Sequence, residues 1–394
     1  METWRKIRLG DACVTNTSSY SAKEGWKFVN YLDTGNITEN RIDSIWHIDL
    51  EDEKLPSRAK RKVRMNSIIY STVRPNQRHF GIIKMKPENF LVSTGFVVID
   101  VDTDIIDADF LYYLLAQPVF VEMLHAIAEQ STSAYPSIKP SDIENLEIEI
   151  PSLTTQKAIA SVLGSLDKKV NQNAEINKNL EQQISSIYAN LCENKSWNSC
   201  ELGSLIDVRD GTHDSPKPQS DGYLLVTSKH LLPYGVDRIT PNRIAKKDFK
   251  KINERSLVEP GDVLMSMIGT IGLISFVADQ TIDYAIKNVA LFKTSKTPEL
   301  AYYFLTFLKS KKTQQYIEMC LAGSTQKYIS LGELRKMPIP DPASETLERF
   351  NKIVRPMYQT IILNTQENNA FAELRDSLLP QLMSGELDVS DIDI

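Results

Sequence analysis

The sequence predicts an α+β protein in which two similar mixed α/β domains are separated by a long antiparallel two-helix coiled coil, with pseudo-twofold symmetry. Three observations lead to this prediction. Short motifs recur about 190 residues apart, each copy ends in a long heptad pattern of apolar residues, and each heptad pattern carries two central asparagines.

The recurring motifs keep the same order in both halves of the chain. "WRKIRLGD" at 4–11 matches "WNSCELGS" at 197–204, "NSIIYS" at 66–71 matches "GDVLMS" at 261–266, "YYLL" at 112–115 matches "YYFL" at 302–305, and "STSAYPSI" at 131–138 matches "STQKYISL" at 324–331. This period is too long for a solenoid repeat. It indicates two copies of one domain, which we expect at 1–150 and 196–342.

Each predicted domain mixes strands and helices. Segments rich in β-branched residues and bounded by Gly, Pro or Asp predict strands. These segments are 67–72, 95–101, 262–268 and 289–294. One apolar helix is expected over 108–124, and its partner in the second half over 298–320.

A long helix is expected after each domain, within 151–195 and within 343–394. The first is predicted from about Thr155 to Cys192 and the second from about Glu345 to Leu379. The first seam alternates steps of four and three residues, which is typical of a coiled coil, at 159, 163, 166, 170, 173, 177, 180, 184, 187 and 191. The second seam falls at 350, 354, 357, 361, 364, 368, 371, 375 and 378. There Arg375 departs from the apolar pattern, and Pro356 is expected to kink or delay the helix.

Asparagines occupy the centre of both seams, at Asn173, Asn177, Asn364 and Asn368. In antiparallel helices these four amides would meet midway. Polar seam residues lower stability but fix register and orientation. The alternative is that this part of the seam is open to solvent, where asparagine is harmless.

The composition is that of an ordinary globular protein. The chain has 394 residues, 42% of them hydrophobic, a net charge of −6 and four cysteines without zinc-site spacing. We therefore expect a reduced, cytoplasmic protein without a structural metal. No apolar run approaches the roughly 18 residues that span a bilayer, so no membrane association is expected.

The basic residues are unevenly distributed along the chain. Ten Lys and Arg residues and no acid lie between Lys54 and Lys86, and seven basic and two acidic residues lie between Arg238 and Arg255. Such runs are often solvated faces, but they also form surfaces that bind polyanions. Both interpretations remain open from charge alone.

The motifs together resemble the specificity subunits of type I restriction–modification systems. The resemblance covers nearly the whole chain and rests on the two-half layout, the exit segment at 131–170, "GTHDSPKP" at 211–218, "GDVLMSMIGTIG" at 261–272 and "LRDSLLPQLMSGEL" at 374–387. It implies a non-catalytic chain with two target-recognition domains, each of which reads one half of a bipartite, asymmetric site in double-stranded DNA. The helices would set the gap and hold two methyltransferase subunits.

The resemblance also implies further partners and the place of the cofactors. Restriction/translocase subunits would join the full complex. No cofactor is expected on this chain, whereas S-adenosylmethionine, ATP and Mg would be bound by the partner subunits.

Base-reading candidates were chosen by side-chain chemistry, because Arg suits guanine and Asn or Gln suits adenine. In the first half they are Arg74, Asn76, Gln77, Arg78, His79 and Asn36. In the second half they are Arg209, Thr212, His213, Lys217, Ser228, Lys229 and His230. Phosphate contacts are expected from Lys60, Arg61, Lys62 and Arg64. For each of them, a solvated loop side chain is the alternative.

Two other functions remain possible from the sequence. The chain could be a coiled-coil scaffold with protein-binding end domains, or a self-contained DNA-modifying enzyme. An adenine methyltransferase would need an "NPPY"-type tetrapeptide and a Gly-rich cofactor loop, and neither occurs. "ENK" at 193–195 has the letters of a nuclease motif but is expected at a helix end.

Overall fold

The computed structural model describes residues 4–130, 136–193, 198–323 and 327–392, without the side chains of 192 and 193. Its contacts divide the chain into two compact units. Unit 1 comprises Met1–Val170 and Ala370–Ile394, and unit 2 comprises Asn171–Asn369. The motif residues 131–135, Trp197 and 324–326, the "NK" of "ENK" and the predicted boundary at 195/196 lie outside the described residues.

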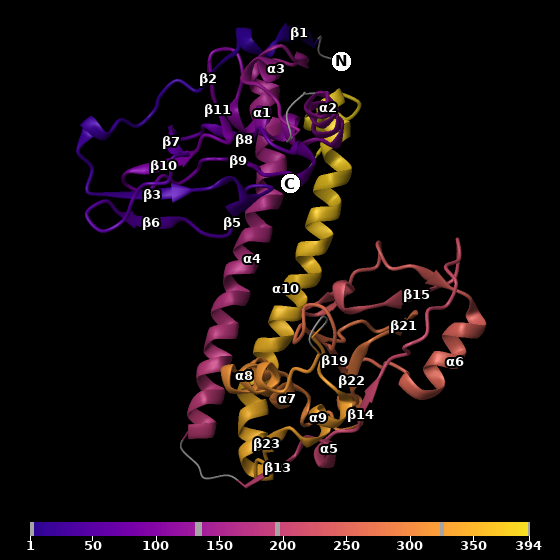
Figure 1. The fold of residues 1–394 in the computed structure, drawn as a ribbon. Coiled ribbons are helices and arrows are strands. Elements are labelled where there is room, and N and C mark those ends of the chain that lie inside the picture. Colours follow the sequence, from indigo (N-terminus) through magenta and orange to yellow (C-terminus); the bar gives the residue numbers. More distant parts are fainter. Residues whose placement is uncertain (1–3, 131–135, 194–197, 324–326, 393–394) are drawn as a thin grey trace. The chain divides into compact units, whose positions relative to one another are not determined.

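Two four-stranded sheets and two small sheets form the β-structure of unit 1 (Figure 1). The first has the order β2 (Cys13–Thr15), β11 (Phe96–Val101), β8 (Ile68–Ser71), β9 (Phe80–Ile82). The second has the order β6 (Trp46–Asp49), β3 (Phe28–Leu32), β10 (Phe90–Ser93), β7 (Ala59–Lys62), with β3 parallel to β10. The small sheets pair β1 (Arg5–Arg8) with β12 (Glu147–Ile150), and β4 (Ile37–Thr38) with β5 (Arg41–Ile42).

Unit 2 repeats this strand order. Its first sheet is β14 (Val208–Asp210), β22 (Val289–Phe292), β19 (Val263–Ser266), β20 (Ile274–Phe276). Its second is β18 (Arg243–Ile244), β15 (Tyr223–Val226), β21 (Tyr284–Ile286), again with a parallel pair, β15 and β21. The small pairs are β13 (Ser199–Glu201) with β23 (Pro338–Pro340), and β16 (Leu231–Leu232) with β17 (Gly235–Val236).

The units differ in one segment that precedes the central strand of the first sheet. In unit 1 the strand β7 lies between β6 and β8 in the sequence, whereas in unit 2 the helix α6 (Lys246–Ser256) lies between β18 and β19. The predicted repeat and the four predicted strands are confirmed by this topology. We call the segment between β6 and β8 in unit 1, and between β18 and β19 in unit 2, the variable segment.

The predicted single apolar helix of each half was wrong, because each is two helices. The first is α1 (Ala108–Ala116) and α2 (Pro118–Glu129), bent by 68°. The second is α7 (Ala301–Lys309) and α8 (Lys311–Met319). Gln117 is extended before Pro118, as residues preceding proline prefer, and Ser310 caps α8 by accepting a hydrogen bond from the Thr313 amide.

Shorter helices connect the remaining elements. They are the α-helices α3 (Pro140–Glu144), α5 (Leu202–Leu205) and α9 (Leu331–Lys336), and the 3-10 helices η1 (Leu9–Asp11), η2 (Ala22–Glu24), η3 (Thr34–Asn36), η4 (Pro75–Gln77), η5 (Ser228–His230), η6 (Thr294–Lys296) and η7 (Val389–Asp391). Among the described residues, no single helix is long and apolar enough to cross a bilayer, and only the bent pair of α1 and α2 reaches that length together.

Two long helices, α4 (Leu153–Glu193) and α10 (Ser344–Ser384), contribute to both cores. Both extend slightly beyond the predicted limits. The expected delay at Pro356 was wrong, since α10 continues through this exposed residue. The alternative expectation of a kink stays a prediction. The predicted seam positions are buried or half-buried along both helices, which confirms the amphipathic pattern.

In unit 1, the seam residue Arg375 is accounted for by an ion pair. Its Nη1 donates to Asp167 Oδ1 of α4 at 2.7 Å, and Tyr113 Oη donates to the other carboxylate oxygen at 2.6 Å. The carboxylate thus joins α1, α4 and α10. A charged residue can occupy this half-buried seam position because its charge is paired there.

In unit 2, the central asparagines connect α4 and α10. Asn364 Nδ2 donates to Asn177 Oδ1 at 2.8 Å, and Asn173 Nδ2 donates to Glu367 Oε2 at 2.8 Å. A later residue of α4 therefore meets an earlier residue of α10, which is antiparallel order. Asn368 Oδ1 is buried without a hydrogen-bond partner in the described part of the chain, so the four amides do not form one cluster.

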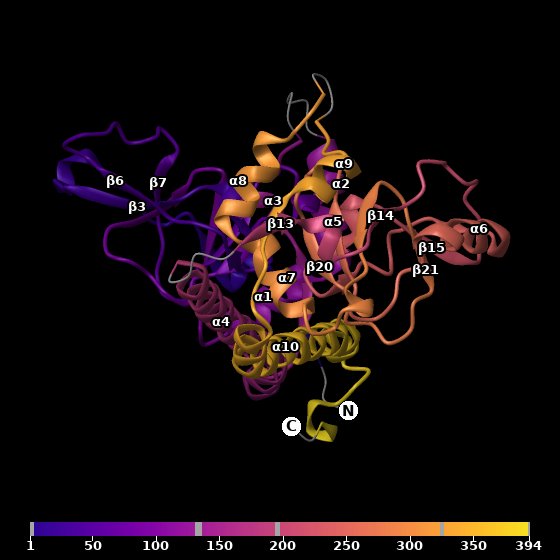
Figure 2. The same ribbon diagram turned by 90° about the horizontal axis from the view of Figure 1, so that it is seen from below.

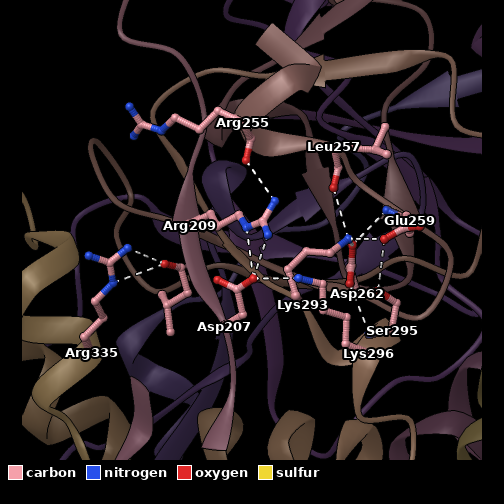
Figure 3. Close-up of polar contacts among 11 residues, drawn as sticks. Asp207, Arg209, Arg255, Leu257, Glu259, Asp262, Lys293, Ser295, Lys296 and Arg335 are labelled. Atoms are coloured by element: carbon pink, nitrogen blue, oxygen red, sulfur yellow. Dashed lines mark hydrogen bonds and ion pairs between the residues drawn. The ribbon is translucent and has the colours of Figure 1, made fainter. Parts of the chain in front are cut away.

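A buried ammonium group stabilises the first sheet of unit 2 (Figure 3). Lys293, which follows β22, is 2% exposed, and its Nζ donates to Asp262 Oδ2 at 2.6 Å, Glu259 Oε2 at 2.6 Å and Leu257 O at 3.0 Å. Asp262 is fully buried and also accepts from the amides of Glu259 and Ser295. The charges are therefore fully hydrogen-bonded, as buried ions require.

We predict that Asp262→Asn destabilises unit 2 by about 3–5 kcal/mol, because it removes the fully buried one of the two carboxylates that pair with the buried ammonium of Lys293. Urea unfolding of the full chain measures this loss. Glu259→Gln is the matched control: its side chain is about half exposed, so it is expected to cost below about 1 kcal/mol. Equal effects of the two substitutions would contradict the prediction.

Candidate nucleic-acid interface

The loop between β8 and β9 carries the largest cluster of predicted base-reading residues. Arg74 precedes η4 with φ 48°, and its amide donates to Pro136 O at 3.2 Å. Arg74, Asn76 and Gln77 are exposed. Their side chains make no hydrogen bond or ion pair with other described residues, so they are free to contact a ligand.

Arg78 and His79 of the same loop already have intramolecular partners. Arg78 pairs with Glu39, its Nη2 donates to Ala116 O at 2.9 Å, and its guanidinium lies 5.5 Å from the centre of the Phe80 ring. His79 Nδ1 lies 2.6 Å from Ile37 O. These two residues hold the loop in place, whatever contact they also make with a ligand.

Asn36 lies at the end of η3, next to the small hairpin of β4 and β5. Its Nδ2 donates to Ser44 Oγ at 2.8 Å. Its side-chain amide oxygen accepts no hydrogen bond from another residue that the structure describes.

The strand β7 carries three of the predicted phosphate-binding residues of unit 1, and Arg64 follows it. Lys62 pairs with Glu24 and lies 5.1 Å from the centre of the Trp26 ring, and Arg64 Nε is 4.0 Å from Asp100 Oδ2. Lys60 is exposed and forms no ion pair among the described residues. Arg61 Nε is buried without a hydrogen-bond partner there, and burial lowers the pKa of its guanidinium.

The acid-free stretch of unit 1 is thus partly neutralised within the fold. Four of its ten basic residues form ion pairs, namely Lys62, Arg64, Arg78 and Lys84. Their carboxylates come from outside the stretch. The charges of Lys60, Arg61 and Arg74 are not neutralised in this way.

In unit 2, close packing fixes the loop after β14, and hydrogen bonds and an ion pair hold Arg209 within β14 itself. A Cβ on Gly211 would lie 2.3 Å from Ile286 O, so only glycine fits there. Arg209 Nη2 donates to Asp207 Oδ2 at 2.7 Å, and its Nη1 donates to Arg255 O at 3.1 Å (Figure 3). Hydrogen bonds from Arg209 and Lys296 lower the pKa of Asp207 to about 2.

The tip of this loop is more open. His213 is exposed, with Nε2 3.0 Å from Asp210 Oδ2 and Nδ1 2.8 Å from Asn288 Oδ1. Thr212 Oγ1 accepts from the Asp214 amide at 3.0 Å. Lys217 is exposed and its ammonium forms no ion pair in the described part of the chain. "GTIG" at 269–272 forms the tight turn between β19 and β20, with φ above 80° at both glycines.

The residues of η5 are unequally placed. Lys229 is exposed, Ser228 is half-buried and His230 is 3% exposed. His230 Nδ1 accepts from the Thr227 amide at 3.0 Å, and burial lowers the pKa of the imidazole. His230 therefore acts as a neutral cap of η5. Because it is buried, it is not placed to contact a base, contrary to the prediction.

A hollow of about 280 Å³ separates the loop after β14 from α6. Asp210, Thr212, Asp214 and Ser215 line it from β14 and its loop, and Asp248, Lys251 and Arg255 line it from α6. The residues of α6 were missed as site candidates, although their charge run was noted. The three-residue spacing of the apolar residues Phe249 and Ile252 is the signal that could have identified the helix.

No group of three His, Cys, Asp or Glu side chains in the described segments is placed to hold a metal ion. What both units present instead is polar and basic side chains on loops and on the variable segment. Such side chains can contact phosphates and base edges.

Comparisons with known proteins agree with this arrangement. A family model described as the type I restriction modification DNA specificity domain matches residues 1–182 and 194–372. The HindI specificity subunit of Haemophilus influenzae is 23% identical, over 98% of this chain and 100% of the relative. The MjaIX specificity subunit of Methanocaldococcus jannaschii is 26% identical, over 79% and 76%.

The fold is also found among solved structures. The crystal structure of a type I restriction-modification system S subunit from M. genitalium covers 97% of this chain and 96% of its own, with a TM-score of 0.60 and 16% identity. Two matched segments together span most of the sequence. The chain therefore belongs to the family of type I restriction–modification DNA specificity subunits.

Proposed function

We propose that units 1 and 2 each read one half of a bipartite, asymmetric site in double-stranded DNA. The observation that carries this proposal is that the units share one strand order but differ in the variable segment and in their loops. Two readers on one frame with different contact residues would recognise two different half-sites. Family membership favours this function over a scaffold or a self-contained enzyme.

The helices α4 and α10 would form an antiparallel coiled-coil spacer between target-recognition domains at 1–150 and 196–342, with pseudo-twofold symmetry. Each helix has 41 residues, roughly 60 Å at about 1.5 Å per residue. One turn of DNA is about 34–36 Å long. A spacer of this length supports recognition of a gap between the half-sites.

The same helices would dock two modification subunits. Ile176, Ile353 and Leu363 are large apolar residues at least 46% exposed on the helix surfaces of unit 2. Such residues favour a protein partner. We propose that this cytoplasmic chain is non-catalytic, that S-adenosylmethionine, ATP and Mg are bound by the modification and restriction subunits, and that it joins both in the full complex.

Mapping of methylated adenines in the source cell tests this function. The expected result is two unlike short sequences separated by a constant gap, lost when the gene for this chain is deleted. A contiguous motif, or methylation that persists after the deletion, would overturn the proposal.

We predict that Arg74→Ala relaxes the base preference at one position of one half-site, by about 1–3 kcal/mol if the lost contact is bidentate. Binding of the assembled complex to duplexes with single substitutions measures this effect. Arg78→Ala is the informative comparison. Because Arg78 pairs with Glu39 and donates to Ala116 O, its loss should also lower thermal stability. Unchanged preference in Arg74→Ala would refute the assignment.

We predict that deleting residues 171–177 together with 362–368 shortens the recognised gap. Each deletion removes seven residues and keeps the seam in phase, so the spacer would lose roughly 10 Å, or about three base pairs. Methylation mapping with the shortened chain measures the gap. If the gap stays the same while methylation persists, the helices do not set the spacing.

A further inference from the structure

We propose that α6 of unit 2 is a phosphate-binding helix, whose four lysines contact the DNA backbone beside the half-site that this unit reads. The lysines are Lys246, Lys247, Lys250 and Lys251. This inference rests on the proposed function and assigns residues that the sequence did not single out.

The helix has a fixed orientation on unit 2. Phe249 stacks on Tyr223 with 3.9 Å between ring centres, and Ile252 packs in a small apolar cluster with Leu225 and Ala285. Both views place α6 beside β15 and β21 (Figure 1, Figure 2). At about 100° per residue, Lys247 and Lys251 point away from this buried side, and all four lysines are exposed.

These lysines differ from the other basic residues of their run. Arg238 pairs with Asp283 at 2.6 Å, Arg243 donates to Gly222 O at 2.9 Å, and Arg255 pairs with Asp210. The four lysines form no ion pair or side-chain hydrogen bond within the described segments. Arg255 holds α6 to β14 through Asp210. The helix also carries two acids, Asp248 and Glu254, but neither forms an ion pair with these lysines among the described residues.

The arrangement is unfavourable for the isolated helix. Lys246 and Lys250, like Lys247 and Lys251, are like charges four residues apart, which destabilises a helix. Lys246 and Lys247 also lie at the positive end of the helix dipole, where cations are disfavoured. Local features that oppose the fold are expected at functional sites. A bound polyanion would relieve both conflicts.

The helix also adjoins a predicted base-reading loop. Lys251 lines the same hollow as Thr212, Asp214 and Ser215 of the loop after β14. A duplex that offers base edges to this loop would therefore bring neighbouring phosphates to α6. The lysines would position the duplex without reading its sequence.

The variable segment of unit 1 supports the same role. There the segment is the strand β7, which carries the exposed Lys60 and the half-buried Arg61. The strand β7 and the helix α6 differ in secondary structure, yet both expose basic residues that have no carboxylate partner among the described residues. A common polyanionic ligand explains why charge recurs in this segment while secondary structure changes.

The test uses the full chain assembled with its modification subunits and the double variant Lys247→Gln/Lys251→Gln. The probes are two duplexes of equal length, one with the site found by methylation mapping and one without it. The slope of log K against log salt is expected to shrink by about 1.8, at about 0.9 per phosphate contact. Affinity should fall equally for both duplexes, so that preference is retained.

Two matched variants complete the experiment. Lys311→Gln/Lys312→Gln removes the same charge from exposed positions on α8, and its slope should equal that of the wild type. Lys247→Arg/Lys251→Arg keeps the charge and should keep the slope, which separates charge loss from misfolding. If the α6 glutamine variant has the slope of the α8 variant, this inference is overturned while the proposed function stands. If the wild type shows no preference for the mapped site, the proposed function itself fails.

Discussion

Each core of this protein is completed by helical segments that are remote in the sequence, and the rest of the structure depends on this closure. In unit 1, Leu382 and Met383 of α10 share a core with Ile159 and Leu163 of α4. In unit 2, Ile184 of α4 meets residues of α10 in the core. The sequence repeat and the compact units therefore do not coincide. Neither half of the chain contains all the apolar residues of its own core, and folding must bring distant segments together.

The fold was predictable where the spacing of apolar residues in the sequence indicates which side of a helix or strand is buried. The seam of α4 and the strands β8 and β19 follow from such patterns. The breaks in the apolar helices were not predicted, because Gln117 and Ser310 act through local caps and backbone angles, which hydrophobicity does not show. The local signal of Pro356 did not predict where α10 begins, since the helix starts at Ser344 and continues through the proline.

The sequence identified the loops that carry the candidate DNA-contacting residues, but not the role of each residue in them. Side-chain chemistry alone could not show that Arg78 is paired with Glu39 or that His230 is a buried cap, because both contacts join residues through the folded backbone. A run of basic residues also gives no indication of its secondary structure. Both runs are rich in Lys and Arg, yet one contains β7 and the other α6.

The four lysines of α6, which form no ion pair among the described residues, affect how a DNA duplex approaches the protein. The chain carries a net charge of −6, so the molecule as a whole repels a polyanion at long range. A local cationic helix on an acidic molecule creates a torque that turns the incoming duplex before contact. A larger share of encounters would then begin in the binding orientation. The acidity of the chain would in this way raise the rate of its association with DNA.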